Sequence, residues 1–284
     1  MITVITTFYQ GNRYIPRLIQ MLEANAKRLK QEQIGRTVEY LLINDSPWEP
    51  IQLPESGVEN LTIRILDNEQ NMGIHKSRIR GIREARGELL TILDQDDEIA
   101  EDFLVSQYRA LGAGDAVICN GYKEMSGYTK SIYRDRLKMS LINRKTVYLK
   151  AANQIVSPGQ ALLRKNAIPQ PWLDYPMAQN GADDLFLWLL YLNKGTKFVA
   201  NPQKLYTHKQ VGDNLSNSLE AMCRSDEEMC DILRKNSLLP EKDIRKRERM
   251  CAFLAANGYR NRLSLSGLLK YPDILFWKVF AYWC

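Results

Sequence analysis

The chain has 284 residues, of which 45% are hydrophobic and 25% charged, and these ordinary proportions exclude a disordered chain. The length predicts one large domain or one domain plus an appendage. It contains no run of about 18 apolar residues that could span a membrane, and its opening segment, MITVITTFYQ, is typical of a strand rather than a signal peptide. The net charge of +6 suits an anionic ligand, an anionic membrane surface or nucleic acid, or it reflects only a solvated surface. The five cysteines include no CxxC pair, which favours a reducing cytoplasm over disulfides or a zinc site.

The first hundred residues alternate between strand-like and helix-like patterns. Apolar and β-branched runs predict strands at residues 2–7, 38–43, 61–66 and 89–93, and helical spacing predicts helices at residues 14–30 and 74–86. Strand, helix and strand in repetition predict right-handed crossovers and a mostly parallel α/β sheet flanked by helices. Ligands of such sheets bind at the carboxyl ends of the strands, where Phe8, Asp45 and the run Asp94–Asp97 are placed.

The rest of the chain is mixed and then helical. We expect a helix at residues 103–111, strands at 116–120 and 161–164, a turn at 157–159 and an apolar helix at 183–192. Residues 122–148 could hold a hairpin or an acceptor loop. From Leu219 onward the pattern is helical and richly charged, so we place a domain boundary near residue 216.

A cluster of acids follows the fourth predicted strand. Asp94, Asp96 and Asp97 lie so close in sequence that their charges repel one another unless a cation or hydrogen-bond donors neutralise them. Oxygen ligands of this kind suit Mg²⁺ or Mn²⁺, and such an ion could stabilise a diphosphate as it leaves. A polar turn that caps a helix is the alternative interpretation.

The segment LLTILDQDDEI resembles the strand and DxD motif of glycosyltransferase family 2, an inverting group with the GT-A fold. Three upstream segments are similar to the family segments that precede this motif, namely TTFYQGNRYIPRLIQML, LLINDSP and NMGIHKSRIRGIREARGE. In the last of them, Ser77, Ile79 and Arg80 depart from the family pattern. Downstream, SPGQALLRKN and NGADDLFLWLLY resemble the acceptor-side strand and the acidic motif that opens a helix. The resemblance implies a GT-A domain at residues 1–215 and a helical extension at residues 216–284.

The resemblance also implies which residues hold a nucleotide-sugar donor and its metal. Donor-binding roles fall on the positions that match the family's motifs, namely Thr6, Thr7, Phe8, Asp45, Asn71, Gly73, Arg78 and Asp94. The expected metal ligands are Asp96, with Asp94 and the late His208, for Mn²⁺ or Mg²⁺. Turn chemistry could equally explain Asp45, and His208 could be an ordinary surface residue. The other basic residues of the helix at 74–86 are expected to form a solvated face, and without interleaved aromatics they do not favour nucleic acid.

The acidic pair Asp183–Asp184 would carry the catalysis. By the resemblance Asp184 is the base that deprotonates the acceptor, and Asp183 stands where the family usually has Glu. A double N-cap of the following helix is the alternative. Trp172 could stack on an acceptor sugar or belong to the core, whereas Trp188 is assigned to the core because it lies on an apolar helix face.

The last segment, LLKYPDILFWKVFAYWC, is rich in aromatic residues next to basic ones. It suits an interfacial helix at the inner face of the plasma membrane, or a helix that packs on the domain or on a second subunit.

These features predict an inverting, metal-dependent transferase that moves a sugar from a UDP-sugar to a hydroxyl of a glycan or lipid-linked saccharide in cell-surface polysaccharide synthesis. A degenerate GT-A domain that binds sugar nucleotides or serves as an assembly subunit is the main alternative. A DxD phosphatase or a nucleotidyltransferase fits less well, because Glu98 follows the acids and the first strand lacks a Gly-rich loop.

Overall fold

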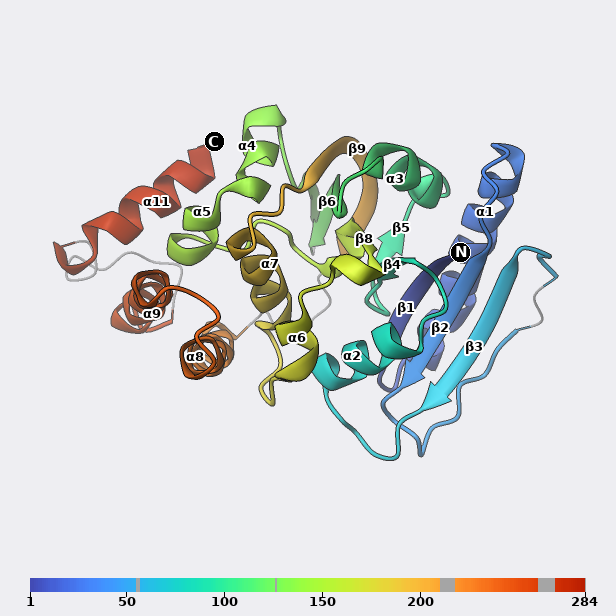
Figure 1. The fold of residues 1–284 in the computed structure, drawn as a ribbon, viewed down its shortest axis with the longest axis horizontal. Helices are drawn as coiled ribbons and strands as arrows, with labels where there is room; N and C mark the ends of the chain where they lie inside the picture. Colours follow the sequence, from blue (N-terminus) through green and yellow to red (C-terminus); the bar gives the residue numbers. More distant parts are fainter. Residues whose placement is uncertain (55–56, 126, 210–217, 260–268, 284) are drawn as a thin grey trace. The chain divides into compact units, whose positions relative to one another are not determined.

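The computed structural model describes residues 1–54, 57–125, 127–209, 218–259 and 269–283 (Figure 1). It divides into two compact units. The sheet unit comprises residues 1–134, 155–168 and the segment from Lys197 through the last strand, and the helical unit comprises residues 135–154, 169–196 and the helices from residue 218 on. The boundary predicted at residues 215 and 216 lies outside the described residues.

A nine-stranded sheet forms the centre of the sheet unit within the described residues. Its strands are β1 (Ile2–Phe8), β2 (Val38–Asn44), β3 (Leu61–Asp67), β4 (Leu89–Ile92), β5 (Glu98–Ile99), β6 (Ala116–Met125), β7 (Tyr128–Ser131), β8 (Ala161–Arg164) and β9 (Val199–Lys209). The order is β3-β2-β1-β4-β8-β6-β9-β5, and β7 pairs with β6. The predicted strands in residues 1–100 are confirmed.

The parallel part of the sheet is its first half. Strands β3, β2, β1 and β4 run parallel, as predicted, but β8 pairs antiparallel with both β4 and β6, and β9 is again parallel to β6. The sheet is therefore mixed, with β8 and β5 each antiparallel to their neighbours. Residues 122–131 form the hairpin of β6 and β7, one of the two alternatives for that segment.

Helices cover both faces of the parallel half. They are α1 (Ile15–Gln31), preceded by a 3-10 turn at Asn12–Tyr14, and α2 (Ile74–Glu84), whereas α3 (Phe103–Leu111) packs against β6, β8 and β9 in the other half. Leu18 and Leu22 of α1 pack in one core with Val4 of β1. Gly81 of α2 lies against Ile5, the residue that follows Val4 in β1. Successive strand residues point to opposite faces, so α1 and α2 lie on opposite sides of the sheet. Strand β2 is accordingly buried along its whole length.

The helical unit joins segments that are far apart in the sequence. Its helices are α4 (Arg136–Ser140), α5 (Lys145–Lys150), α6 (Gln170–Asp174), α7 (Asp183–Asn193), α8 (Leu219–Lys235), α9 (Glu241–Ala256) and α11 (Pro272–Trp283), with a 3-10 turn at Leu141–Asn143 between α4 and α5. Buried Arg247 of α9 pairs with Asp226 of α8 and donates to the carbonyl of Tyr148 in α5 at 3.0 Å. Helices α9 and α11 thus pack against α5 within this unit. No helix among the described residues is both long enough and apolar enough to cross a bilayer.

Candidate active site

The ends of β1, β2 and β4 are tied together at one edge of the sheet. Because Phe8 pairs with Asn44 and Ile5 with Ile92, the three chains leave the sheet side by side. The Gln95 side chain accepts from the Tyr9 amide at 3.0 Å and donates to the Tyr9 carbonyl at 3.1 Å. This double hydrogen bond fastens the acidic loop, residues 94–97, to the loop after β1. The predicted gathering of these strand ends is confirmed.

Of the residues predicted at the end of β1, two are part of the protein interior. Phe8 is buried in the hydrophobic core, and Thr6 is buried with its hydroxyl accepting from Tyr40 at 3.3 Å, while Thr7 is half-buried. The exposed aromatic at this strand end is Tyr9, at 45%, and its ring meets exposed Trp48 edge-to-face with centroids 6.1 Å apart. Phe8 is thus a core residue, because β1 lies between two covered faces and its side chain points into one of them.

Asp45 organises the segment that leads into α2. One carboxylate oxygen accepts from the side chain of Asn68 at 2.6 Å and from the amide of Met72 at 2.7 Å, and the other accepts from the amide of Gly73 at 3.0 Å. Asn71 also accepts from the Gly73 amide, at 3.0 Å. Turn chemistry was the alternative interpretation of Asp45. Its contacts extend beyond that local turn and organise the segment before α2.

Gly73 is required by the backbone at the start of α2. Its φ of 83° and ψ of 165° lie in a region that residues with a Cβ essentially do not adopt. This explains why Asn71 and Gly73 occur together: the Asn side chain accepts from the backbone that the glycine bends.

Arg78 lies beneath the acidic loop. It is buried, in contrast to Lys76, Arg83 and Arg86, which are exposed as predicted for a solvated face. Its guanidinium donates to one oxygen of Asp94, and the hydroxyl of Ser157 donates to the other at 2.9 Å. Both oxygens of Asp94 thus have donors, and one of those donors is a cation.

Asp97 is the buried anchor of the loop. It accepts from the hydroxyl of Tyr206, from the amide of Lys209 at 2.9 Å, and lies 3.1 Å from Nδ1 of His208. A carboxylate on one ring nitrogen fixes the orientation of an imidazole and leaves the other nitrogen for a ligand. Local sequence patterns do not predict the contact of Asp97 with His208, because β9 lies more than a hundred residues downstream.

Asp96 is the carboxylate of this loop whose charge is least compensated. Its partial burial, with the nearby charges of Asp97 and Asp94, raises the pKa of Asp96 to about 6. Within the described part of the chain, no Lys or Arg pairs with its carboxylate. A hard cation is the kind of ligand that would relieve this repulsion, so the donor chemistry fits Mg²⁺ or Mn²⁺.

The described residues do not form a metal cage by themselves: no group of three His, Cys, Asp or Glu side chains there could hold an ion. The predicted ligands Asp94, Asp96 and His208 are therefore not brought together as a complete set. Sites for Mg²⁺ usually combine one or two carboxylates with substrate phosphates rather than using such a cage. These side chains therefore fit a metal ion that is held partly by the protein and partly by the phosphates of a bound ligand.

The second acidic pair begins α7 in the helical unit. Asp184 is half-buried, and its two oxygens accept from the side chain of Asn153 at 2.8 Å and from the amide of Leu185 at 2.6 Å. Asp183 is buried, and its carbonyl accepts from the indole of Trp172 at 2.7 Å. The N-cap residue of α7 is Ala182, without a side-chain cap.

The aromatic residues around this pair belong to the interior. Trp172 and Trp188 are both fully buried. The hypothesis that Trp172 stacks on an acceptor sugar is therefore wrong. Its indole N–H donates to the buried carbonyl of Asp183, and because this polar group is satisfied, the large ring can be buried in the core.

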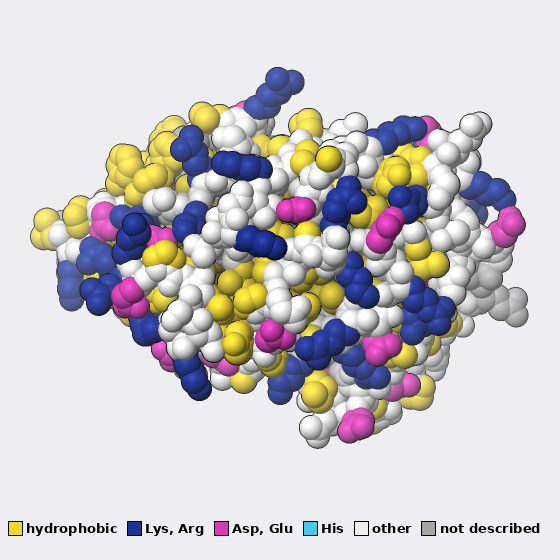
Figure 2. Space-filling view, viewed as in Figure 1, with side chains coloured by type: hydrophobic (Ala, Val, Ile, Leu, Met, Phe, Trp, Pro, Cys, Tyr) yellow, Lys and Arg dark blue, Asp and Glu magenta, His cyan; other side chains and the backbone are white. Residues whose placement is uncertain are grey.

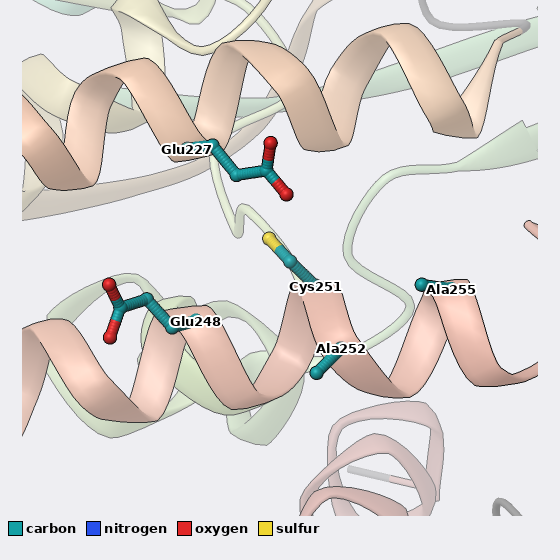
Figure 3. Close-up of a pocket in the computed structure, with 5 residues that line it drawn as sticks. All are labelled: Glu227, Glu248, Cys251, Ala252 and Ala255. Atoms are coloured by element: carbon teal, nitrogen blue, oxygen red, sulfur yellow. The ribbon is translucent and has the colours of Figure 1, made fainter.

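The helical unit also contains a cavity of about 250 Å³ between α8 and α9. Figure 3 shows the residues that line it, which are Glu227, Glu248, Cys251, Ala252 and Ala255. None of the residues predicted for donor, metal or catalysis lines it. The site defined by the sequence motifs is thus not this cavity.

Comparison with known families shows the class of protein that this fold and these motifs define. Residues 3–170 match the family model Glycosyl transferase family 2. The match covers more than half of the 284 residues, and the chain belongs to glycosyl transferase family 2.

Two curated relatives are similar over part of their length. EpsH of Bacillus subtilis (strain 168) is 24% identical over 182 residues, which are 62% of this chain and 50% of EpsH. Glycosyltransferase GlyG of Streptococcus pneumoniae serotype 4 is 25% identical over 138 residues, 45% of this chain and 42% of GlyG. The chain thus spans about half the length of the curated relatives it matches.

Solved structures confirm the fold. Residues 1–349 of S. aureus TarS in complex with UDP-GlcNAc superpose with a TM-score of 0.60 at 15% identity, covering 99% of this chain and 81% of that one. The mannosyltransferase PcManGT of Pyrobaculum calidifontis, in complex with GDP-Man and Mn²⁺, gives a TM-score of 0.56 at 13% identity, covering 99% and 84%. At such identities the likeness shows the fold alone, and the predicted GT-A fold is confirmed.

Proposed function

We propose that this chain is an inverting, metal-dependent glycosyltransferase that uses a UDP-sugar and acts in cell-surface polysaccharide synthesis. Its acceptor would be a hydroxyl of a glycan or a lipid-linked saccharide. The observation that carries the proposal is the acidic loop, in which Asp94 and Asp97 are held by partners while no Lys or Arg among the described residues pairs with Asp96. Family membership and the UDP-GlcNAc complex of a protein with the same fold support the choice of donor.

In this proposal the loops after β1 and β2 hold the nucleotide. The exposed ring of Tyr9 replaces Phe8 as the surface on which the base stacks, because an aromatic face must be accessible to do so. Asp45 fixes Asn71 and Gly73 in the conformation that faces the donor and keeps acceptor capacity on one oxygen for the base. Arg78, which is held by Asp94, supplies positive charge beneath the phosphates.

Asp96 would hold Mn²⁺ or Mg²⁺ together with the donor diphosphate, and His208, oriented by Asp97, would offer its second ring nitrogen. When bound, the ion supplies charge neutralisation for the leaving diphosphate. The chain's own contribution is to orient His208 through Asp97 and to anchor the loop that carries Asp96 before the donor arrives. Asp94 would orient the donor through its contacts with Arg78 and Ser157 rather than act as a main ligand.

Asp184 is the proposed base. Asn153 and the Leu185 amide hold its carboxylate through neutral donors, so that it can accept a proton from the acceptor hydroxyl. As the acceptor oxygen bonds to the anomeric carbon, the bond from that carbon to the diphosphate oxygen breaks, and the configuration inverts. Asp183 supports the base by anchoring the start of α7 through its contact with Trp172.

UDP release from a panel of UDP-sugars, with Mn²⁺ and an extract of lipid-linked saccharides as acceptors, tests this function. We expect release that depends on the acceptor and is lost with a chelator. Donor binding without any release, with every sugar and acceptor fraction, would instead identify a degenerate GT-A domain.

A further inference from the structure

Helix α11 is apolar on both sides, but only one side is covered. Ile274 and Ala281 are buried, and Ala281 belongs to a small core with Leu141 and Val147. The opposite side carries large exposed side chains, here called the aromatic stripe, which are Phe276 at 62%, Val279 at 46%, Tyr282 at 77% and Trp283 at 68%. Spacings of three and four residues place them along one side of the helix.

The aromatic stripe concentrates exposed apolar surface in one place. Leu269, immediately before α11, is 78% exposed, and Leu137 of α4, whose neighbour Lys138 contacts the Ala281 carbonyl, is 61% exposed. Figure 2 shows hydrophobic side chains gathered along α11 with Lys and Arg side chains beside them. A helix that is apolar all round is normally buried, and a contiguous exposed apolar patch marks an interaction site.

The charge around the stripe indicates what covers it. Residues 135–150 and 269–283 together contain seven Lys or Arg and two Asp, a net charge of +5, against +6 for the whole chain. Several of these cations are paired, as Lys150 is with Asp273 at 2.9 Å. Arg136, Arg144 and Lys270 are exposed. Apolar surface flanked by exposed cations is complementary to an anionic lipid surface, where Trp and Tyr also favour the headgroup region.

The length of α11 decides how it would meet a bilayer. Twelve residues give a helix about 18 Å long, whereas a hydrocarbon core of about 30 Å needs about 20 residues. The helix is therefore too short to span and is suited to lie in the interface.

We propose that α11 docks the helical unit onto an anionic bilayer, with the aromatic stripe inserted among the headgroups and Arg136, Arg144 and Lys270 contacting lipid phosphates. The inference does not rest on the proposed transferase activity, because it uses only the exposed side of the helical unit. It adds an attachment surface to a protein whose proposed acceptors include lipid-linked saccharides.

Flotation of the full chain with vesicles tests this proposal, using phosphatidylcholine alone and phosphatidylcholine with about one third phosphatidylglycerol. We expect the chain to bind the anionic vesicles, and we expect this binding to weaken in high salt. Arg136→Gln and Arg144→Gln should each weaken it about fivefold. The double variant Phe276→Gln/Trp283→Gln should bind at least tenfold more weakly. A matched control is Tyr128→Gln, which removes a 53% exposed aromatic from β7 and should bind like the parent chain.

Several results would overturn the proposal. One is absence of binding to anionic vesicles by a folded parent chain, and another is equal binding by the stripe variant. A third is a parent chain that is a dimer by light scattering, with the stripe variant a monomer and neither binding vesicles, because a second copy would then cover the stripe. A cooperative thermal melt of each variant shows that it is folded, and since flotation uses no donor or acceptor, a protein without transferase activity would still bind.

Discussion

The acidic loop after β4 and the acidic pair that begins α7 look alike in sequence, but different groups hold their carboxylates. In the loop, Asp94 is held by a cation, the guanidinium of Arg78, while Asp97 accepts from the Tyr206 hydroxyl and the Lys209 amide and orients His208. For Asp184, by contrast, the two described hydrogen bonds come from neutral donors, an amide side chain and a backbone N–H. A cationic partner stabilises the ionised form of a carboxylate, whereas neutral donors orient it and leave its charge available.

Asp96 is a third case, since burial and the charges of Asp97 and Asp94 outweigh the groups that stabilise its ionised form, and no Lys or Arg of the described residues pairs with it. The comparison therefore assigns three roles by environment: orientation by Asp94 and Asp97, cation binding by Asp96, and proton transfer by Asp184. Four substitutions separate these roles, beginning with the largest expected effect.

Asp184→Asn should abolish sugar transfer, a loss of about 10²–10⁴-fold, because the amide keeps the contacts of the carboxylate but cannot take the proton. Donor affinity should stay within about twofold, as measured by calorimetry with the UDP-sugar. Asp174→Asn, which neutralises an exposed acid of α6, is the matched control and should transfer normally. Transfer by Asp184→Asn at a tenth of the parent rate or more would show that the base lies elsewhere.

Asp96→Ala should weaken UDP-sugar binding at least tenfold when Mn²⁺ is present, an effect of about 1.4 kcal/mol or more. Without metal, the variant and the parent chain should bind donor with similar low affinity. Glu101→Gln removes a nearby exposed acid and should leave the metal dependence unchanged. Equal metal dependence in Asp96→Ala would remove this residue from the ligand set.

Gly73→Ala should lower the free energy of unfolding by about 1–3 kcal/mol, because a Cβ strains the backbone at φ 83°. Donor affinity should fall as well, since the residues that Asp45 holds would shift. Gly35→Ala is the control, because a Cβ there meets no neighbouring atom and its φ is not positive. Denaturant unfolding of the two variants makes the comparison, and equal stability would contradict the backbone argument.

Asp96→Asn should stabilise the metal-free protein above pH 6 by about 1–2 kcal/mol, after allowance for its partial exposure. The pKa of Asp96 is about 6 in the folded protein against 3.8 ordinarily, so the folded state holds its proton more tightly. The stability linked to that proton is present at pH 4 and is lost as the pH rises through 6. Thermal melts should therefore diverge between pH 4 and pH 7.5, and parallel profiles would show that Asp96 is compensated.

Much of this arrangement could be predicted from local patterns, because strand ends in a parallel sheet meet at one edge. The placement of Asp45, Arg78 and Asp94 follows from that rule. The burial of Phe8 and exposure of Tyr9 could not be predicted, since β1 is covered on both faces and both residues are aromatic. Nor could the contact of Asp97 with His208, which depends on how β9 pairs with β5.

The make-up of the helical unit was also beyond the sequence pattern. Its segments are interrupted by strands of the sheet unit, and one of the contacts that join α9 to α5 is a buried side chain on a backbone carbonyl. The position of Trp172 could not be predicted from the sequence either. Its burial and its buried partner, the Asp183 carbonyl, are what distinguish a core ring from one that stacks on a sugar.

The most direct test of the central claim is a thermal-shift panel of UDP, GDP, CMP and dTDP, each with and without Mn²⁺. A ligand at one hundred times its Kd adds about 2.7 kcal/mol of stability, which is easily measured. We predict a shift with UDP only when Mn²⁺ is present, and its loss in Asp96→Ala. A folded parent chain that shifts with none of the nucleotides, or with UDP equally in the absence of metal, would contradict the account.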